Sequence, residues 1–455
     1  MVGVLPVLLL ALQQPGTCSG SEFGPGTECR TLLVAENPER PEGRKIPIRY
    51  VVLPATGAKE PEALFLFSGG PGAASSELVG MANGVLQSVR LRRDIVLVDQ
   101  RGTGGSHALM CDLELRNYPA RAFGHVFDPA FMTSCRKTHE NNTDLTQYTT
   151  ERAIADIDLV RRTEGYEKVI LWGGSFGTRI AQSYARRYPD RVMAMVLDGV
   201  VPYDFKIPLS YAATLQESVN RALSSCRSRA GCRDSFPDLA KQWQSLVERF
   251  RTGPVEVTVT PRNGGPARVK MHLGDFGYAV RGILYRVDQS RQLPAMIANA
   301  AATGNLDLFA QRYYSRAADF EADFADGLHL ASLCSEETSQ IRDTDVSGAT
   351  AGSFIGSYLI DEYRNACAGW PRARLPDAVR QPLTARVPTL LVSGYFDPVT
   401  PPEMADRVAR YLPLHRHIVD SASHHGSSFG CARPAVLHVL TTGKLEGLPE
   451  VCKRT

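Results

Sequence analysis

The stretch Val169-Ile-Leu-Trp-Gly-Gly-Ser-Phe-Gly-Thr178 decides the fold of this chain. It starts as an apolar run typical of a buried strand, passes through the pattern Gly173-x-Ser175-x-Gly177, and continues into a helical pattern over 178–188. A strand, a tight glycine turn and a helix in this order present the serine hydroxyl at the head of a helix, as a nucleophile elbow does. A purely structural glycine turn is the alternative, and the flanking strand and helix favour the elbow.

Apolar, β-branched runs on both sides of this stretch predict further strands. They cover 46–53, 63–67, 95–98, 169–172 and 193–197, and the pattern resumes at 389–393 and 415–419. Helical spacing of apolar residues over 150–163 fills one of the gaps. Continuous apolar strands that alternate with helices indicate a mostly parallel sheet covered by helices on both faces, so the predicted fold class is α/β.

The spacing of apolar residues changes between the two groups of predicted strands. Helical patterns dominate residues 203–385, over 211–230, 236–250, 276–302 and 306–324, and one strand-like stretch covers 255–259. The prediction is a core made of residues 18–202 and 386–455, with a mainly helical cap of residues 203–385 between the two parts.

A serine needs a base to remove its proton and an acid to orient that base. Asp397 follows the predicted strand 389–393, and His425 follows the next strand, so the order serine, acid, histidine is satisfied. Asp420 is the competing acid. His424 is the competing base, but Gly426 leaves room for the loop to pass close to the elbow and favours His425.

Acyl transfer also requires N–H donors for the oxyanion. The backbone N–H of Phe176, which follows the serine, is one candidate, and that of Gly70 in Ser68-Gly-Gly-Pro-Gly72 is the other. A phosphate-binding loop is disfavoured there, because the segment has neither Gly-Lys-Ser/Thr nor Gly-x-Gly-x-x-Gly. The set needs no metal or cofactor, and the cysteines lie too far apart for a metal site.

The chain has 455 residues, and its ten cysteines are its unusual count. Cys226 and Cys232 bracket a short predicted loop, and other cysteines neighbour each other in sequence. This spacing suggests disulfides in an oxidising compartment, hence a secreted or periplasmic protein. The pairs are Cys111/Cys135, Cys226/Cys232, Cys334/Cys367 and Cys431/Cys452, with Cys18/Cys29 possible only if a leader is cut before Cys18.

A short apolar run at 4–12 predicts such a leader, over 1–17, because a membrane span needs roughly 20 residues. No basic residue precedes that run, so a misassigned N-terminus remains the alternative. The net charge of +3, with the two signs interspersed, gives no reason to expect nucleic acid, and no membrane contact is expected after the leader is removed.

Five motifs together resemble one family. They are Ser68-Gly-Gly-Pro-Gly72, Val98-Asp-Gln-Arg-Gly-Thr-Gly-Gly-Ser106, Tyr148-Thr-Thr150, Gly173-Gly-Ser-Phe-Gly-Thr178 and Val196-Leu-Asp-Gly199. The chain is similar to the proline iminopeptidase and secreted tripeptidyl aminopeptidase branch of the α/β-hydrolases. The resemblance implies the α/β-hydrolase fold, with Ser175, Asp397 and His425 as the triad and Gly70 and Phe176 as oxyanion donors.

The resemblance also implies a serine exopeptidase that cuts peptides near a free N-terminus through an acyl-enzyme. Such an enzyme must recognise an α-ammonium group, and Glu336 and Glu337 are the candidate partners, with ordinary solvated acids as the alternative. A secreted esterase or amidase for small acyl substrates is the second interpretation, because a triad serves any acyl group. A hydrolase-fold binding protein without activity is disfavoured by the intact triad.

Overall fold

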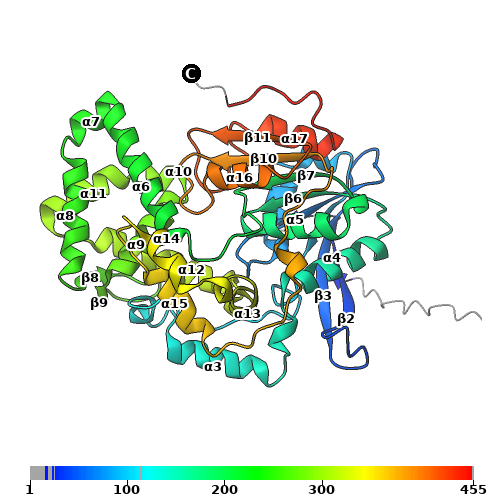
Figure 1. Ribbon diagram of the computed structural model, residues 1–455, viewed down its shortest axis with the longest axis horizontal. Helices are drawn as coiled ribbons and strands as arrows, with labels where there is room; N and C mark the ends of the chain where they lie inside the picture. Colours follow the sequence, from blue (N-terminus) through cyan, green and yellow to red (C-terminus); the bar gives the residue numbers. More distant parts are fainter. Residues whose placement is uncertain (1–15, 19–22, 25, 113, 453–455) are drawn as a thin grey trace, which may run out of the picture.

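The computed structural model describes residues 16–18, 23–24, 26–112 and 114–452 (Figure 1). The predicted leader, 1–17, lies outside these residues except for its last two. The described residues form a nine-stranded sheet in the order β1-β2-β3-β5-β4-β6-β7-β10-β11. β5, β4, β6, β7, β10 and β11 run parallel to one another, whereas β1, β2 and β3 form antiparallel pairs at one edge, and β3 is also antiparallel to β5.

The predicted strands match the structure to within two residues, and β1 and β2 were not predicted. The bounds are β1 Gly16–Thr17, β2 Glu28–Ala35, β3 Lys45–Leu53, β4 Ala63–Phe67, β5 Ile95–Val98, β6 Val169–Gly174, β7 Val192–Asp198, β10 Thr389–Gly394 and β11 His415–Asp420. The six residues of β10 and all of β4 and β5 are buried, because helices cover both faces of the sheet.

Alternate residues of the central strands enter two separate apolar layers. One layer packs against α4 (Thr150–Thr163), α5 (Phe176–Arg187) and α16 (Pro402–Ala409). The other packs against α1 (Val79–Asn83), α2 (Gln87–Arg90) and α17 (Arg433–Thr442). This arrangement confirms the predicted α/β class with a mostly parallel sheet covered on both faces.

The segment between β7 and β10 lies to one side of the sheet (Figure 1). Its elements are α6 Tyr211–Ser228, α7 Ala230–Ser235, α8 Leu239–Arg251, the hairpin β8 Val255–Val259 and β9 Ala267–Met271, α9 Leu273–Leu284, α10 Val287–Ser290, α11 Leu293–Thr303, α12 Asp307–Asp323, α13 Asp326–Glu336, α14 Asp343–Thr350 and α15 Tyr358–Cys367. The single helix predicted over 276–302 is three helices, because the backbone is extended at Arg286, between α9 and α10, and a new helix begins at Leu293 with Pro294 in its first turn.

Residues between β5 and α4 pack against these cap helices, although the sequence placed them in the core. The Glu362 carboxylate of α15 accepts hydrogen bonds from the backbone N–H groups of Val126 (2.8 Å) and Phe127 (3.2 Å). The Asp275 carboxylate of α9 accepts one from Gly124 at 3.1 Å. α3 (Pro129–Glu140) lies beside α13 and α15 at the bottom of Figure 1.

Five disulfides join the ten cysteines in the pairs that the spacing predicted. They are Cys18–Cys29, Cys111–Cys135, Cys226–Cys232, Cys334–Cys367 and Cys431–Cys452. Cys111–Cys135 closes a loop within the segment between β5 and α4, which packs against the cap, and Cys334–Cys367 links α13 to α15. Within the described ranges, the helices are all too short or too polar to cross a membrane.

The surroundings of Cys232 differ from the prediction, although its partner is the predicted one. The expected loop between Cys226 and Cys232 is wrong, because Cys226 lies in α6 and Cys232 lies in α7. The backbone is extended only at Arg229, where one helix ends and the next begins. Cys232 is half-buried and lines a hollow of the cap that does not include Ser175, so this bridge holds two cap helices together away from the predicted nucleophile.

Candidate active site

Ser175 stands at a strained turn between β6 and α5. Its φ of 54° and ψ of −124° lie outside the regions that side-chain-bearing residues usually adopt. The turn is held by a hydrogen bond from the Ser175 N–H to the Asp198 carbonyl oxygen at 2.8 Å. Gly177 allows the helix to lie against β4, since a Cβ there would be 2.2 Å from the Phe67 carbonyl oxygen.

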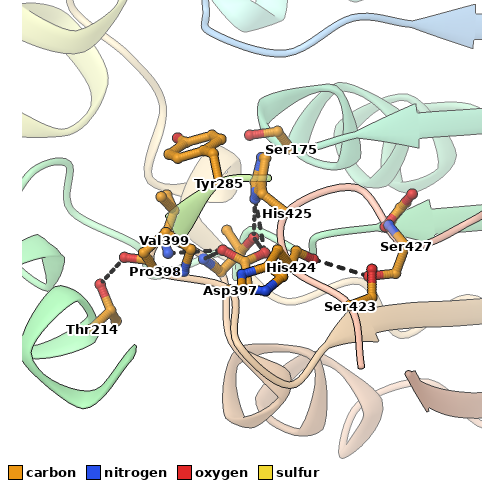
Figure 2. A network of polar contacts seen from close by, with 12 residues as sticks. Ser175, Thr214, Tyr285, Asp397, Pro398, Val399, Ser423, His424, His425 and Ser427 are labelled. Atoms are coloured by element: carbon orange, nitrogen blue, oxygen red, sulfur yellow. Dashed lines mark hydrogen bonds and ion pairs between the residues drawn. The ribbon is translucent and has the colours of Figure 1, made fainter. Parts of the chain in front are cut away.

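His425 lies between Ser175 and Asp397 (Figure 2). Its Nδ1 donates to Asp397 Oδ2 at 2.8 Å, and this contact fixes the tautomer whose Nε2 is free to accept a proton. Asp397 is fully buried and also accepts hydrogen bonds from the N–H groups of Val399 (2.8 Å) and Thr400 (2.9 Å) and from the Thr400 hydroxyl (2.8 Å). The carboxylate is therefore held in one orientation.

The electrostatics of this pair favour an ion pair in the resting protein. Burial opposes charge on both groups, but the Asp397 carboxylate outweighs it and raises the pKa of His425 to about 9. Burial would likewise raise the pKa of Asp397, but the His425 ring and the loop hydrogen bonds hold it below its usual value.

His424 and Asp420, the competing base and acid, form contacts with loop residues instead. His424 Nδ1 donates to the Leu284 carbonyl oxygen at 2.7 Å, and its ring stacks on Phe396 with centroids 5.2 Å apart. The Asp420 carboxylate accepts from the N–H groups of Ala422 (3.0 Å) and Cys431 (3.2 Å). The geometry thus brings Asp397 and His425, rather than Asp420 and His424, to Ser175.

Asp198, at the end of β7, positions both sides of this cluster; in the sequence it was part of the motif 196–199 but was given no role of its own. Its carbonyl oxygen holds Ser175, and its buried carboxylate accepts from the N–H groups of Ser427 and Ser428, both at 2.8 Å. The loop that carries His425 is therefore attached to the strand next to the nucleophile turn. A buried acid at the end of a parallel strand was the available signal.

The two predicted oxyanion donors are backbone N–H groups of segments close to the serine. Phe176 is the first residue of α5, and the first N–H groups of a helix have no partner within the helix. Gly70 lies on the loop after β4 and lines the same cavity as Ser175. The neighbour of Gly70, Gly69, lies directly against the serine, since a Cβ there would be 3.0 Å from Ser175 Cβ, and the donor role of Gly70 and Phe176 stays a prediction.

A cavity of about 390 Å³ opens over Ser175 and His425. The cap supplies half of the residues that line it, including the aromatic side chains of Tyr211, Tyr278, Tyr285, Tyr313 and Tyr363. The Tyr285 ring lies 4.7 Å from the His425 ring, centroid to centroid. Sequence reasoning missed these residues, because the pattern predicts a helix but not what its faces contact.

Phe324, between α12 and α13, attaches the cap to residues 69–72. Phe324 pairs with Ala73 in an isolated antiparallel bridge, and a Cβ at Gly72 would lie 2.7 Å from the Phe324 ring. The buried ring of His329 donates from Nδ1 to the Pro71 carbonyl oxygen at 2.7 Å and accepts from the Tyr363 hydroxyl at 3.0 Å. Burial lowers the pKa of His329 to about 4, so this ring is neutral at pH 7.

Glu336 and Glu337 do not lie at this cavity, which corrects their choice as partners of a substrate amine. The Glu336 carboxylate accepts from the Thr150 N–H at 2.6 Å, and Glu337 forms a buried ion pair with Arg179 at 2.5 Å. Both line a different hollow, between the cap and α5. They connect the cap to the core instead.

The acids that do line the cavity are Glu321 and Asp326. Glu321 accepts a hydrogen bond from the Leu115 N–H at 3.0 Å. Burial and the nearby Glu321 carboxylate raise the pKa of Asp326 to about 7. No hydrogen bond or ion pair to the Asp326 carboxylate is formed by the residues that the structure describes.

Comparisons with known proteins agree with this architecture. Residues 62–234 match the alpha/beta hydrolase fold family, and residues 352–452 match the family described as TAP-like protein. The serine protease Hip1 of Mycobacterium tuberculosis is 27% identical over 436 residues, which cover 88% of this chain and 82% of that protein.

Two further relatives match shorter parts of the chain. The tripeptidyl aminopeptidase of Streptomyces coelicolor is 27% identical over 208 residues, 42% of this chain and 38% of that protein. The proline iminopeptidase of Neisseria gonorrhoeae is 29% identical over 154 residues, 34% of this chain and 37% of that protein. The chain is thus an α/β-hydrolase with a TAP-like region, and a homologue of serine peptidases.

Proposed function

We propose that this protein is a serine exopeptidase that cuts peptides near a free N-terminus through an acyl-enzyme. The observation that carries the proposal is the arrangement of Ser175, His425 and Asp397 (Figure 2). Ser175 and His425 line a cavity that also holds the unpaired Asp326 carboxylate. The serine peptidase relatives support the same reaction class.

In the acylation step, His425 Nε2 takes the proton of Ser175 as the serine oxygen attacks the scissile carbonyl carbon. The carbonyl oxygen becomes an oxyanion and accepts hydrogen bonds from the N–H groups of Phe176 and Gly70. The C–N bond then breaks, and His425 gives its proton to the departing amine. Asp397 stays ionised and stabilises the imidazolium throughout.

In the deacylation step, a water molecule takes the place of the amine. His425 accepts one of its protons while the oxygen attacks the ester, and Ser175 recovers its proton when the C–O bond breaks. The products are the released N-terminal fragment and the shortened peptide.

Asp326 is the proposed partner of the substrate ammonium. A carboxylate that is uncharged up to about pH 7 because of burial gains most when a cation arrives, since the ion pair then offsets its desolvation. Asp326 also begins α13, where the helix dipole favours negative charge. Glu321 on the same wall adds a second negative charge.

The five disulfides support a site of action in an oxidising compartment, so we place the mature protein outside the cytosol. No cofactor or metal enters the proposed reaction.

The test is an assay of tripeptide anilides with free and acetylated N-termini beside p-nitrophenyl acetate. We expect kcat/KM to be at least tenfold higher for the free amine, and Ser175→Ala to abolish turnover of every substrate. Turnover of the ester with no cleavage of any anilide would contradict the proposal and favour the esterase interpretation.

Asp326→Asn tests the amine site separately. The ratio of kcat/KM between free and acetylated anilides should fall toward one, because the substrate ammonium loses its counter-charge. Asp323→Asn is the matched control, since Asp323 is an exposed acid that lies outside the cavity of Ser175. A ratio that stays at the wild-type value in Asp326→Asn would refute this assignment.

A further inference from the structure

We propose that Arg281 and Arg316 form a carboxylate-binding subsite beside the active site, so that the preferred substrates carry a carboxylate close to the scissile bond. This inference rests on the proposed peptidase function and names the substrate class of that site. The carboxylate comes either from an acidic side chain or from the C-terminus of a short peptide.

Both arginines line the cavity that holds Ser175 and His425. Arg281 lies on α9 and Arg316 on α12, two cap helices that pack together. Their guanidinium carbons lie 5.4 Å and 4.6 Å from the centroid of the Tyr285 ring, which in turn contacts His425. The two cations are therefore gathered around one aromatic ring next to the reacting groups.

Neither arginine has a carboxylate partner among the described residues. Arg281 donates from Nη2 to the Tyr285 hydroxyl at 3.2 Å and is otherwise flanked by Tyr211 and Tyr278, and its Nε is buried without an acceptor. Arg316 is exposed to the cavity and stacks on Tyr285.

The other cations of the same cavity are neutralised within the protein. Arg121 pairs with Glu114 at 2.9 Å, and His125 pairs with Glu362 at 3.0 Å. Among the described residues, the arginines of this cavity that lack an acidic partner are therefore Arg281 and Arg316, near His425.

Two like charges held together with an unmet buried N–H cost free energy, which a bound anion would recover. A guanidinium presents its donors in a planar fork that matches a carboxylate, and such charge-assisted hydrogen bonds are stronger than neutral ones. A peptide substrate supplies a carboxylate without any further component. In this arrangement Asp326 binds the ammonium group of the substrate, and Arg281 and Arg316 bind its carboxylate.

The first experiment compares matched substrates that differ in one charge. Ala-Ala-Glu anilide and Ala-Ala-Gln anilide test the side-chain source, whereas Ala-Ala-Ala-Ala and its C-terminal amide test the chain-end source. We expect the wild-type protein to prefer the charged member of one pair by tenfold or more in kcat/KM, as the loss of one charge-assisted hydrogen bond would predict.

The variants are Arg316→Gln and Arg281→Gln, with Arg312→Gln as the matched control. Arg312 lies one turn before Arg316 on α12, donates to Gln292 at 3.0 Å and lies outside the cavity of Ser175. Either cavity variant should reduce the charge preference at least tenfold and leave cleavage of the neutral substrate within threefold. Arg316 is exposed, so its variant tests the proposal even where Arg281→Gln fails to fold.

A binding measurement separates this inference from the peptidase function. The Ser175→Ala protein is titrated calorimetrically with Ala-Ala-Glu amide, Ala-Ala-Gln amide, Ala-Ala-Ala and Ala-Ala-Ala amide. Tighter binding of a charged probe, lost in Ser175→Ala/Arg316→Gln, supports the subsite even if no peptide is cleaved. Equal binding of charged and neutral probes, or a preference that persists in Ser175→Ala/Arg316→Gln, overturns it even if peptides are cleaved.

Discussion

Asp397→Asn is the sharpest test of the proposed triad. The side-chain oxygen of Asn can keep the hydrogen bonds from the N–H groups of Val399 and Thr400, so the loop should stay in place. The amide NH₂ then faces His425 Nδ1, which is 2.8 Å from the present carboxylate oxygen. Because two donors cannot share a hydrogen bond, the ring must move its proton to Nε2 and can no longer accept the proton of Ser175.

The expected loss in kcat is about 10⁴-fold, the size that a wrong histidine tautomer causes in a serine triad, and it corresponds to about 5 kcal/mol in activation free energy. A second effect should appear in the pH profile. In the wild-type protein kcat/KM for an acetylated anilide, which has no amine to titrate, should rise with pH up to about pH 9, since only neutral His425 can act as a base. In the variant, His425 stays buried but has lost the Asp397 carboxylate. Its pKa should therefore fall below the ordinary histidine value, and this limb of the pH profile should move with it.

The assay is steady-state cleavage of a tripeptide anilide, with a free amine for kcat and with an acetylated amine for the pH profile between pH 5 and 10. Asp420→Asn is the control, because the Asp420 carboxylate contacts the two ends of the loop that carries His425 but not the His425 ring, and its loss should leave kcat within tenfold. A kcat for Asp397→Asn within tenfold of the wild-type value, or an unmoved limb, would refute the reasoning.

Three further changes test the surroundings of the site. Gly177→Ala should lower the free energy of unfolding by about 1–3 kcal/mol in chemical denaturation, because its Cβ would meet the Phe67 carbonyl oxygen at 2.2 Å, and an unchanged value would contradict this. His329→Ala should lower kcat about tenfold at unchanged KM, as the loop at Pro71 loses its donor, and an effect on KM alone would count against that role. Folding raises the pKa of Asp326 from 3.8 to about 7, so the wild-type protein should lose stability as pH rises from about 4 to 7. Asp326→Asn has no carboxylate to ionise, so the difference in thermal midpoint between this variant and the wild-type protein should favour the variant more at pH 8 than at pH 5. An equal difference at the two pH values would contradict the raised pKa of Asp326.

The fold could be predicted from the sequence where burial leaves a simple pattern. Strands β4, β5 and β6 are buried on both faces, so their residues form continuous apolar runs. β2 pairs antiparallel next to the edge of the sheet and exposes part of its residues, and its mixed pattern hid it. The turn at Arg286 has neither glycine nor proline, which explains why the break between α9 and α10 was not predicted, whereas Pro294 at the start of α11 was an available signal for the second break.

The candidate site divides in the same way. Ser175, Asp397 and His425 follow strand ends, and the carboxyl ends of parallel strands meet at one edge, so their proximity could be predicted. The cap wall depends on which face of each helix turns inward, and that is set by contacts between distant segments. Glu336 and Asp326 lie on the same helix, yet only Asp326 lines the cavity.

The attachment of Phe324, Ala325 and His329 to residues 70–73 bears on how a substrate enters. A cap that swung open as a lid would carry Gly70 away from Ser175, so entry and chemistry cannot share that motion. If the protein is the exopeptidase proposed above, a cap fixed in this way would let the distance from Ser175 to the far wall of the cavity limit the length of the fragment that is removed.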